Sequence, residues 1–229
     1  MAVSASAPYF RSVFINCPFD ADYRLLFNAI AFAVADCGFI PRCALEAEDS
    51  GDIRILKILD IIEQCGYGIH DISRTESTPS AKRDGTTELL PRFNMPLELG
   101  LFIGAQRFGH GQQKRKNYLV FDVEPHRYQR FISDLAGQDI KAHHWPGMAA
   151  TAEARDRAVS QLILAIRNWL TTKIDGDLLP GGNRLTARFG QFQAELPDMA
   201  TEFGQQVMDL SFYDLLALIA GWQKANPHS

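Results

Sequence analysis

Short apolar runs of strand type alternate along this chain with longer segments whose apolar residues recur at helical spacing. Ser12 to Asn16 (SVFIN) is the first run, and Leu26, Ile30 and Ala33 follow at a helical period. Further strand-type runs are residues 39–44, 66–72, 117–123 and 140–143, and further helical stripes lie in 55–62, 90–105 and 159–170. Alternation with short connections predicts an α/β fold, a flavodoxin-like or Rossmann-like parallel sheet flanked by helices on both faces.

The pattern changes beyond residue 170. Residues 171–184 (TTKIDGDLLPGGNR) have the Gly, Pro and Asp content of a linker, and only a helical period follows them. Ser211 can cap the last helix in a capping box with Asp214. We therefore expect an α/β domain over residues 1–170, a linker over 171–184 and a small helical subdomain over 185–229 that serves for contacts.

Charge and cysteine usage exclude several classes of protein. With 27 acidic and 23 basic residues, the net charge of -4 gives no general attraction to nucleic acid or to an anionic membrane. Cys17, Cys37, Cys43 and Cys65 form no C-x-x-C pair and sit in apolar contexts, which indicates reduced core thiols in a cytoplasm. No signal-like segment and no apolar run of about 20 residues occurs, so we expect a soluble cytoplasmic protein without a membrane partner.

The basic run QQKRK at residues 112–116 has two interpretations. It can be a solvated turn before a strand, or its lysines can contact phosphate or nucleic acid. We expect the solvated turn.

The segments that follow three strands carry the chemistry. Ligands of open parallel sheets bind outside the carboxyl ends of the strands. The first strand leads into a tight turn whose free backbone N–H groups suit a phosphate or ribose, made of Asn16, Cys17, Pro18, Phe19 and Asp20. His70, Asp71 and Ser73 lie at the end of the third strand, and the helix that contains Glu98 begins at the same edge. The sequence predicts that these three segments converge on one cleft.

Glu98 is the candidate catalytic residue. It stands among Met95, Leu97, Leu99 and Leu101 in "LPRFNMPLELGLFIGA", residues 90–105, a segment that reads as a helix apolar on every side. A carboxylate near a helix start is also favoured by the macrodipole, but with Asn94 as N-cap Glu98 falls one position beyond a capping box. Partial desolvation would raise its pKa, which is typical of a working acid or nucleophile.

The other candidates have structural alternatives. Asp71 can contact a ligand or cap the turn that follows it, and His70 is expected to be a core histidine. No G-x-G-x-x-G, P-loop, G-x-S-x-G or H-E-x-x-H motif occurs, and a zinc site is not expected. Two carboxylates at the mouth of a sheet suit cleavage of an N-glycosidic bond, in which one carboxylate stabilises or traps an oxocarbenium-like state.

The segments "FINCPFD", "GIHDIS" and "NMPLELG", in this order, resemble the nucleoside 2-deoxyribosyltransferase family and its relatives, including TIR-type NAD hydrolases and effectors of bacterial anti-phage systems. The resemblance covers about residues 12–145. It implies that Glu98, in the E-x-G segment Glu98-Leu99-Gly100, is catalytic and that Asp71 is the ribose-contacting or acid/base residue. It also implies that residues 16–20 contact the ligand.

A long polar stretch, residues 73–92, departs from typical members of that family. Its cations Lys82, Arg83 and Arg92 would suit a phosphorylated substrate such as NAD, which is then a substrate and not a cofactor. Ser73 and Asn94 flank this stretch as further binding candidates. Tyr67, Phe19 and Phe93 are candidates to stack on a base, and the alternative for each is a place in the core, which is the commoner role of such a ring.

These features together predict an N-glycosidase-type enzyme that acts on NAD or a related nucleotide or nucleoside, and the resemblance implies a role as a defence effector. Assembly into a homo-oligomer, or with a defence partner, would use the C-terminal helices. The alternative is a non-catalytic sensor that binds a nucleotide in the same cleft. A third interpretation is nucleic-acid binding through Lys114, Arg115 and Lys116, although nucleic acid is not the expected partner.

Overall fold

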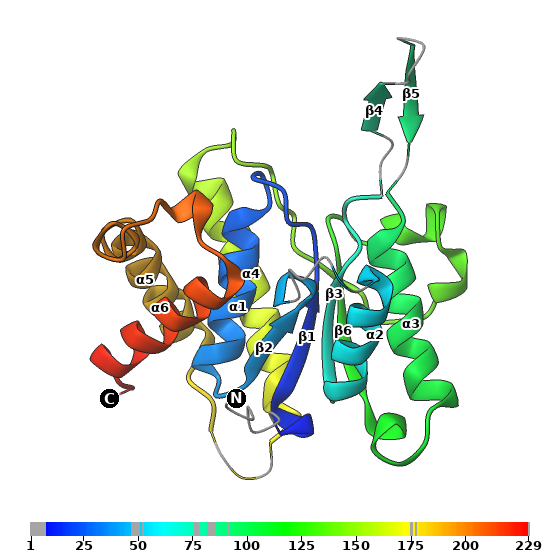
Figure 1. The fold of residues 1–229 in the computed structure, drawn as a ribbon, viewed down its shortest axis with the longest axis horizontal. Helices are drawn as coiled ribbons and strands as arrows, with labels where there is room; N and C mark the ends of the chain where they lie inside the picture. The colour runs from blue at the N-terminus through cyan, green and yellow to red at the C-terminus, as the bar shows by residue number, and fades with distance from the viewer. Residues whose placement is uncertain are drawn as a thin grey trace.

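The computed structural model describes residues 8–46, 51, 53–75, 78–81, 86–90, 92–174, 176 and 178–228. Within them, five parallel strands form one sheet in the order β2 (Ile40–Cys43), β1 (Ser12–Asn16), β3 (Tyr67–Asp71), β6 (Asn117–Asp122) and β7 (Lys141–Ala142) (Figure 1). This is a flavodoxin-like order, and the predicted fold class is confirmed. Every residue of β1 and β3 is buried, because helices cover both faces of the sheet at these strands.

Helices cover both faces of the sheet. Figure 1 shows α1 (Arg24–Asp36) and α4 (Ala152–Thr171) on one face, and α2 (Arg54–Gln64) and α3 (Asn94–Phe108) on the other. Because the chain reverses its direction of winding between β1 and β3, the crevice at their carboxyl ends is the position where such folds bind ligands. None of the helices in the described part of the chain is both long and apolar enough to cross a membrane.

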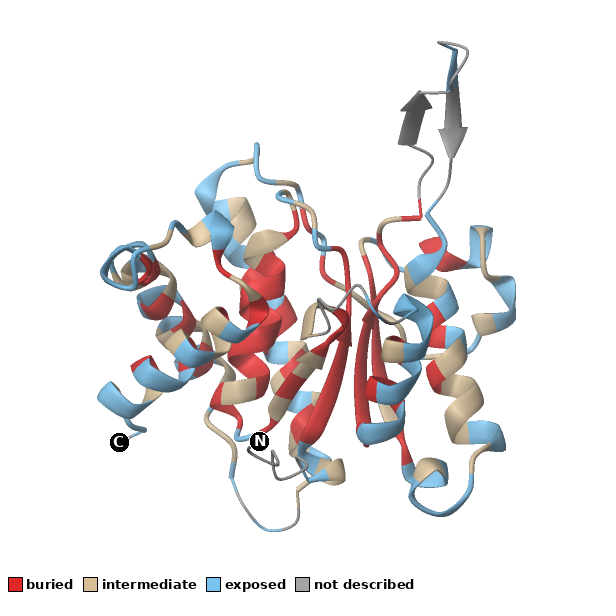
Figure 2. Ribbon diagram, in the orientation of Figure 1, coloured by how far each residue is buried: buried red, intermediate tan, exposed pale blue. Residues whose placement is uncertain are grey.

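The C-terminal helices add a third layer outside α1. α5 (Gly182–Glu202) and α6 (Phe212–Ala225) pack against α1, and α5 also packs against α4. Phe32 of α1 contacts the rings of Phe192 and Trp222, so one hydrophobic core continues from the sheet through α1 into this layer. Figure 2 shows the result, since α1 is buried over most of its surface. The division of the chain at residues 171–184 stays a prediction.

The start of α6 has the capping box that the sequence predicts. Ser211 Oγ accepts the Asp214 backbone N–H at 3.1 Å, and Asp214 Oδ2 accepts the Ser211 N–H at 3.0 Å, which confirms the capping box. Arg188 of α5 forms a two-pronged ion pair with Asp36 at the end of α1. The Arg188–Asp36 pair holds α5 against the end of α1.

α3 differs from its prediction in two respects. Its N-cap is Phe93, which has no side-chain capping bond, and Asn94 is the first helical residue instead of the cap. The helix is not enclosed on every side, because Leu97 and Phe108 are 56% and 80% exposed. Its buried side consists of Glu98, Leu99 and Phe102.

The polar stretch before α3 contains a hairpin that the sequence analysis did not predict. β4 (Thr78–Ala81) pairs antiparallel with β5 (Thr87–Leu90) as a separate sheet. Lys82 and Arg83, the predicted phosphate-binding cations, lie outside the described residues.

Gln112, Lys114 and Arg115 are exposed, as expected for a solvated turn, and the expectation is wrong only for Lys116. Its side chain is buried and its ammonium group donates to the Ile62 carbonyl at 2.6 Å and to the Cys65 carbonyl, at the end of α2. Burial lowers the pKa of Lys116 to about 8. The Lys116 ammonium group and the carbonyls at the end of α2 satisfy each other's hydrogen-bonding needs, which explains why this cation is buried there. The four cysteines are buried free thiols, as predicted.

Candidate functional site

The site lies where β1, β3 and α3 meet. The Asn16 side-chain amide, at the end of β1, donates to the Met95 carbonyl in the first turn of α3 at 2.9 Å. The same nitrogen lies 3.1 Å from Nδ1 of His70 in β3. The three segments predicted to converge are therefore joined by one buried side chain.

Glu98 is the unusual group of this site. It is 8% exposed, and its carboxylate has no hydrogen bond or ion pair to any residue that the structure describes. Burial raises the pKa of Glu98 to about 7, against the opposing charge of Arg54. A buried carboxylate without a partner is costly in the folded state, so this arrangement points to a functional group instead of a structural one.

Asp71, in contrast, is fully engaged. Its Oδ2 accepts the Tyr23 hydroxyl at 2.5 Å and lies 3.1 Å from His143 Nε2, while its Oδ1 accepts the Ser73 backbone N–H at 2.8 Å. His143 Nδ1 accepts the Trp145 backbone N–H, so a neutral His143 carries its proton on the nitrogen that faces Asp71. Burial raises the pKa of Asp71, but His143, the Ser73 N–H and the Tyr23 hydroxyl outweigh it, and the pKa is lowered overall.

This network changes the role that Asp71 can have. Asp71 is fully buried and both of its oxygens are occupied, so it holds the segment after β3 and the side chains of Tyr23 and His143 in place. The interpretation of Asp71 as a turn cap, left open by the sequence, is supported by the Ser73 contact. Contact with a ribose would require it to exchange one of these partners.

A second buried pair stabilises the same segment. Arg127 donates to Asp122 Oδ1, at the end of β6, at 2.8 and 2.5 Å, and also to the carbonyls of Ile72 and Ser73 at 3.2 and 2.9 Å. Burial raises the pKa of Asp122 against the effect of Arg127. This pair ties the ends of β3 and β6 together, so the backbone beside Asp71 is held from two sides.

A cavity of about 230 Å³ opens beside the Asp71 network. Tyr23, Ser73, Arg74 and His143 contribute to its wall. Arg74 pairs with Asp22 at 2.5 Å and lies 3.4 Å from Asp20. The size of this cavity suits a ribose or a phosphate group, and Arg74 is the arginine in its wall.

The residues of the first-strand turn divide into buried and accessible ones. Cys17 and Pro18 are buried. Burial, reinforced by the charges of Asp71, Cys43, Glu98 and Asp20, raises the pKa of Cys17 well above its ordinary value. Cys17 is therefore a packing residue and not a thiolate nucleophile. Phe19 is partly exposed against the ring of Phe27, and Asp20 accepts the Tyr23 backbone N–H.

Tyr67 has the core role that was the alternative to stacking on a base. It opens β3 at the amino edge of the sheet, opposite to the cleft, and packs against the rings of Phe10, Phe39 and Trp169. It cannot stack on a ligand at the carboxyl edge. The position of Tyr67 along β3, and not its residue type, decides which end of the sheet its side chain reaches.

The remaining candidates stay at the site. Phe93, Arg92 and Asn94 are exposed at the start of α3, and Ser73 is buried beside Asp71. His70 is fully buried, as expected, and burial with the charge of Lys116 lowers its pKa to about 3. It therefore stays neutral and is not a base at physiological pH.

The sequence analysis missed Tyr23, His143, Asp122 and Arg127. Asp122 and His143 follow the carboxyl ends of strands, so the rule that identified Asp71 could have found them. Tyr23 and Arg127 gave no signal, because their roles depend on tertiary contacts. Among the described residues, no group of three or more His, Cys, Asp or Glu side chains is placed to hold a metal ion.

Comparisons with family models, curated proteins and solved structures gave no match to this chain. The fold and the site alone therefore define its class, a doubly wound α/β protein with polar and ionisable side chains at the switch point of the sheet.

Proposed function

We propose that this protein is an N-glycosidase-type enzyme that cleaves the base–ribose bond of a nucleotide or nucleoside, with NAD as the favoured substrate. The observation that carries the proposal is the largely buried carboxylate of Glu98, in α3 beside the crevice between β1 and β3, which makes no hydrogen bond or ion pair with any described residue. The resemblance of residues 98–100 to the catalytic E-x-G segment of nucleoside deoxyribosyltransferases and TIR-type hydrolases supports the same residue.

The chemistry needs one carboxylate close to the anomeric carbon. As the bond from C1′ to the base nitrogen breaks, the base leaves with the bonding electrons and positive charge develops on the sugar. The ionised Glu98 stabilises this charge, or forms an ester bond to C1′ that water then hydrolyses. A charge in a poorly solvated environment acts strongly, because little water screens it.

Asp71 enters this proposal as a positioning residue. Through the Ser73 N–H and the Tyr23 hydroxyl it holds the wall of the cavity in which a phosphate of the substrate would lie, because Glu98, which must face the sugar, does not line that cavity. Arg92 is exposed and could pair with a phosphate, whereas Arg74 would have to exchange Asp22 or Asp20 for it; Phe19 and Phe93 are the accessible rings for the base. A defence role and assembly through α5 and α6 rest on the family resemblance alone.

The test follows release of free base from NAD and from a panel of nucleosides and nucleotides by chromatography, at low and high protein concentration. Glu98→Gln keeps the shape of the side chain and removes its charge, and we expect base release to fall by at least about 100-fold. Glu202→Gln, at the exposed end of α5, is the matched control and should keep the wild-type rate.

No release at any concentration, with saturable nucleotide binding that survives Glu98→Gln, would overturn the enzyme proposal. That result would identify a nucleotide sensor that uses the same crevice.

A further inference from the structure

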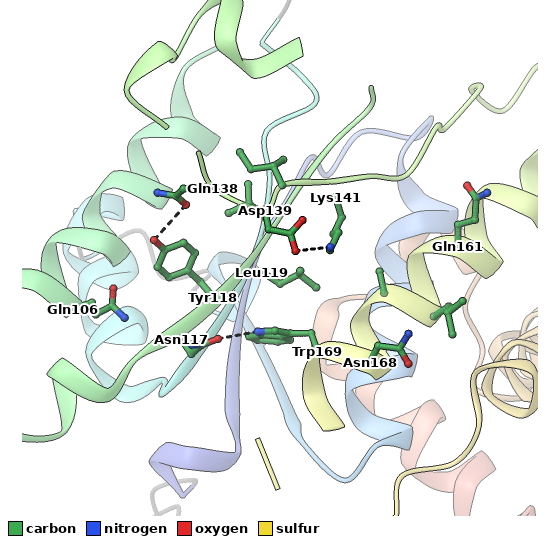
Figure 3. Close-up of a pocket in the computed structure, with 14 residues that line it drawn as sticks. Gln106, Asn117, Tyr118, Leu119, Gln138, Asp139, Lys141, Gln161, Asn168 and Trp169 are labelled. Atoms are coloured by element: carbon green, nitrogen blue, oxygen red, sulfur yellow. Dashed lines mark hydrogen bonds and ion pairs between the residues drawn. The ribbon is translucent and has the colours of Figure 1, made fainter. Parts of the chain in front are cut away.

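A second cavity lies away from the proposed catalytic site. It has a volume of about 850 Å³ and lies between α3, α4 and the outer edge of β6 (Figure 3). Four consecutive residues of β6, from Asn117 to Val120, line it. Because consecutive side chains of a strand point to opposite faces, a cavity lined by all four lies at the edge of the strand and not on one face.

The cavity occupies the place that a longer β7 would fill. β7 has two residues and pairs with Phe121 and Asp122 at the carboxyl end of β6. In the described structure no strand pairs with the preceding residues of β6 on that side. α3 and α4 extend past this gap on the two faces of the sheet, so they form the walls of a groove whose floor is a strand edge.

The main-chain hydrogen-bond pattern shows which groups face the groove. Asp122 directs its carbonyl to the β7 side, where it accepts the His143 N–H at 3.1 Å, whereas Phe121 directs its carbonyl to the β3 side. Main-chain direction alternates along a strand, so the N–H groups of Tyr118 and Val120 face the groove. An open strand edge of this kind is a template for another strand.

Carboxamide side chains line the groove. Gln106 reaches it from α3, Gln161 and Asn168 from α4, and Gln138 from the segment before β7 (Figure 3). Gln106 uses one donor on the Lys116 carbonyl at 2.5 Å and Gln138 accepts the Tyr118 hydroxyl at 3.4 Å, so their remaining donors and acceptors are the ones that face a ligand. A carboxamide offers one acceptor and two donors, which matches the donor and acceptor of a peptide bond.

The charge of the groove is balanced. Lys141 and Asp139, the charged side chains that line it, pair with each other at 2.6 Å. The ring of Trp169 is held in its wall by a 2.9 Å hydrogen bond to Asn117. The lining is therefore neutral as a whole and fits an extended chain without net charge.

We propose that this groove, the β6 edge groove, binds an extended, uncharged peptide segment of a partner protein as an added strand beside residues 117–120. Four residues of strand edge span about 13 Å, which is enough for main-chain hydrogen bonds to the groove-facing groups of β6. Affinity comes from these bonds and selectivity from the carboxamides and the Trp169 ring.

The probe is a nine-residue peptide without net charge, selected from a displayed random library on the wild-type chain and counter-selected on Gln161→Trp. Gln161 is exposed, so the larger ring narrows the groove without entering the core. Gln191→Trp, on the exposed side of α5, is the matched control and should bind the peptide as the wild type does. We expect Gln161→Trp to weaken binding at least about tenfold.

Two readouts separate strand addition from other binding. The Tyr118 amide should exchange its hydrogen more slowly when the peptide is bound, while the Leu119 amide, which faces β3, stays unchanged. N-methylation of the peptide at every second residue should weaken binding about fivefold or more, and at the intervening residues it should not.

Three outcomes would overturn the proposal. They are failure to select any peptide that depends on the groove, a bound peptide that leaves Tyr118 exchange unchanged, and equal sensitivity to N-methylation at all positions. Binding of nicotinamide or adenine in the groove, with no peptide binding, would identify a small-molecule site instead.

Discussion

Glu98→Gln should stabilise the protein, and the gain should grow with pH. The pKa of Glu98 is about 7 in the folded chain, against 4.5 for an ordinary Glu. Between these values the folded state holds a proton that the unfolded state releases, so ionisation at higher pH costs folding free energy. The difference corresponds to about 3 kcal/mol at pH 8 and to less than about 1 kcal/mol at pH 5.

Gln cannot ionise, so the variant avoids this cost. We expect its free energy of unfolding in urea to exceed that of the wild type by about 2 to 3 kcal/mol at pH 8, and by less than about 1 kcal/mol at pH 5. Trp fluorescence follows the transition, and Glu202→Gln should show no such pH-dependent gain. Equal gains at pH 5 and pH 8, or no gain at pH 8, would refute a desolvated Glu98.

The remaining predictions concern the surroundings of the site. Gly100→Ala should raise the free energy of unfolding by about 0.5 to 1 kcal/mol, because a Cβ at this position meets no atom within 4 Å, and Gly104→Ala one turn later should do the same. Thermal unfolding measures both gains. Lower base release in Gly100→Ala alone would show that a ligand needs the space at Gly100. Arg127→Met should lower the free energy of unfolding by about 3 to 5 kcal/mol, because it leaves the Asp122 carboxylate buried without its ion pair. In urea unfolding, the double variant Arg127→Met/Asp122→Leu should recover much of this loss. A double variant as unstable as the single one would contradict that reason. Tyr23→Phe removes one hydrogen bond to the buried Asp71 carboxylate and should lower the free energy of unfolding by about 1 to 3 kcal/mol. It should also reduce base release, and the activity that remains should still be lost on Glu98→Gln. Unchanged stability would mean that this hydrogen bond contributes nothing.

The strand and helix order could be predicted because each element carries its own local signal. β1 is bounded as predicted, and the capping box of α6 was visible in Ser211 and Asp214. The hairpin of β4 and β5 was missed because its strands are short and polar, so they lack an apolar run. The N-cap of α3 was misplaced because Phe93 provides no capping side chain.

The site was predictable only where its residues follow strands. Asn16, Asp71 and Glu98 lie at one edge because parallel strands share their carboxyl ends, and this follows from topology. Packing between distant segments decides that Asp71 contacts Tyr23 and His143, while Glu98 has no hydrogen bond or ion pair to a described residue. Lys116 shows the same limit, since a basic run predicts solvent exposure and only the end of α2 explains its burial.

The pH profile of base release by the wild type tests the central claim most directly. As a nucleophile or cation stabiliser, Glu98 must be ionised, and its pKa is about 7. We therefore predict that kcat/KM for release of base rises between pH 5 and pH 8 with an apparent pKa near 7 and then stays level. A profile that falls through pH 7, or that is flat from pH 5 to pH 9, would contradict this role of Glu98.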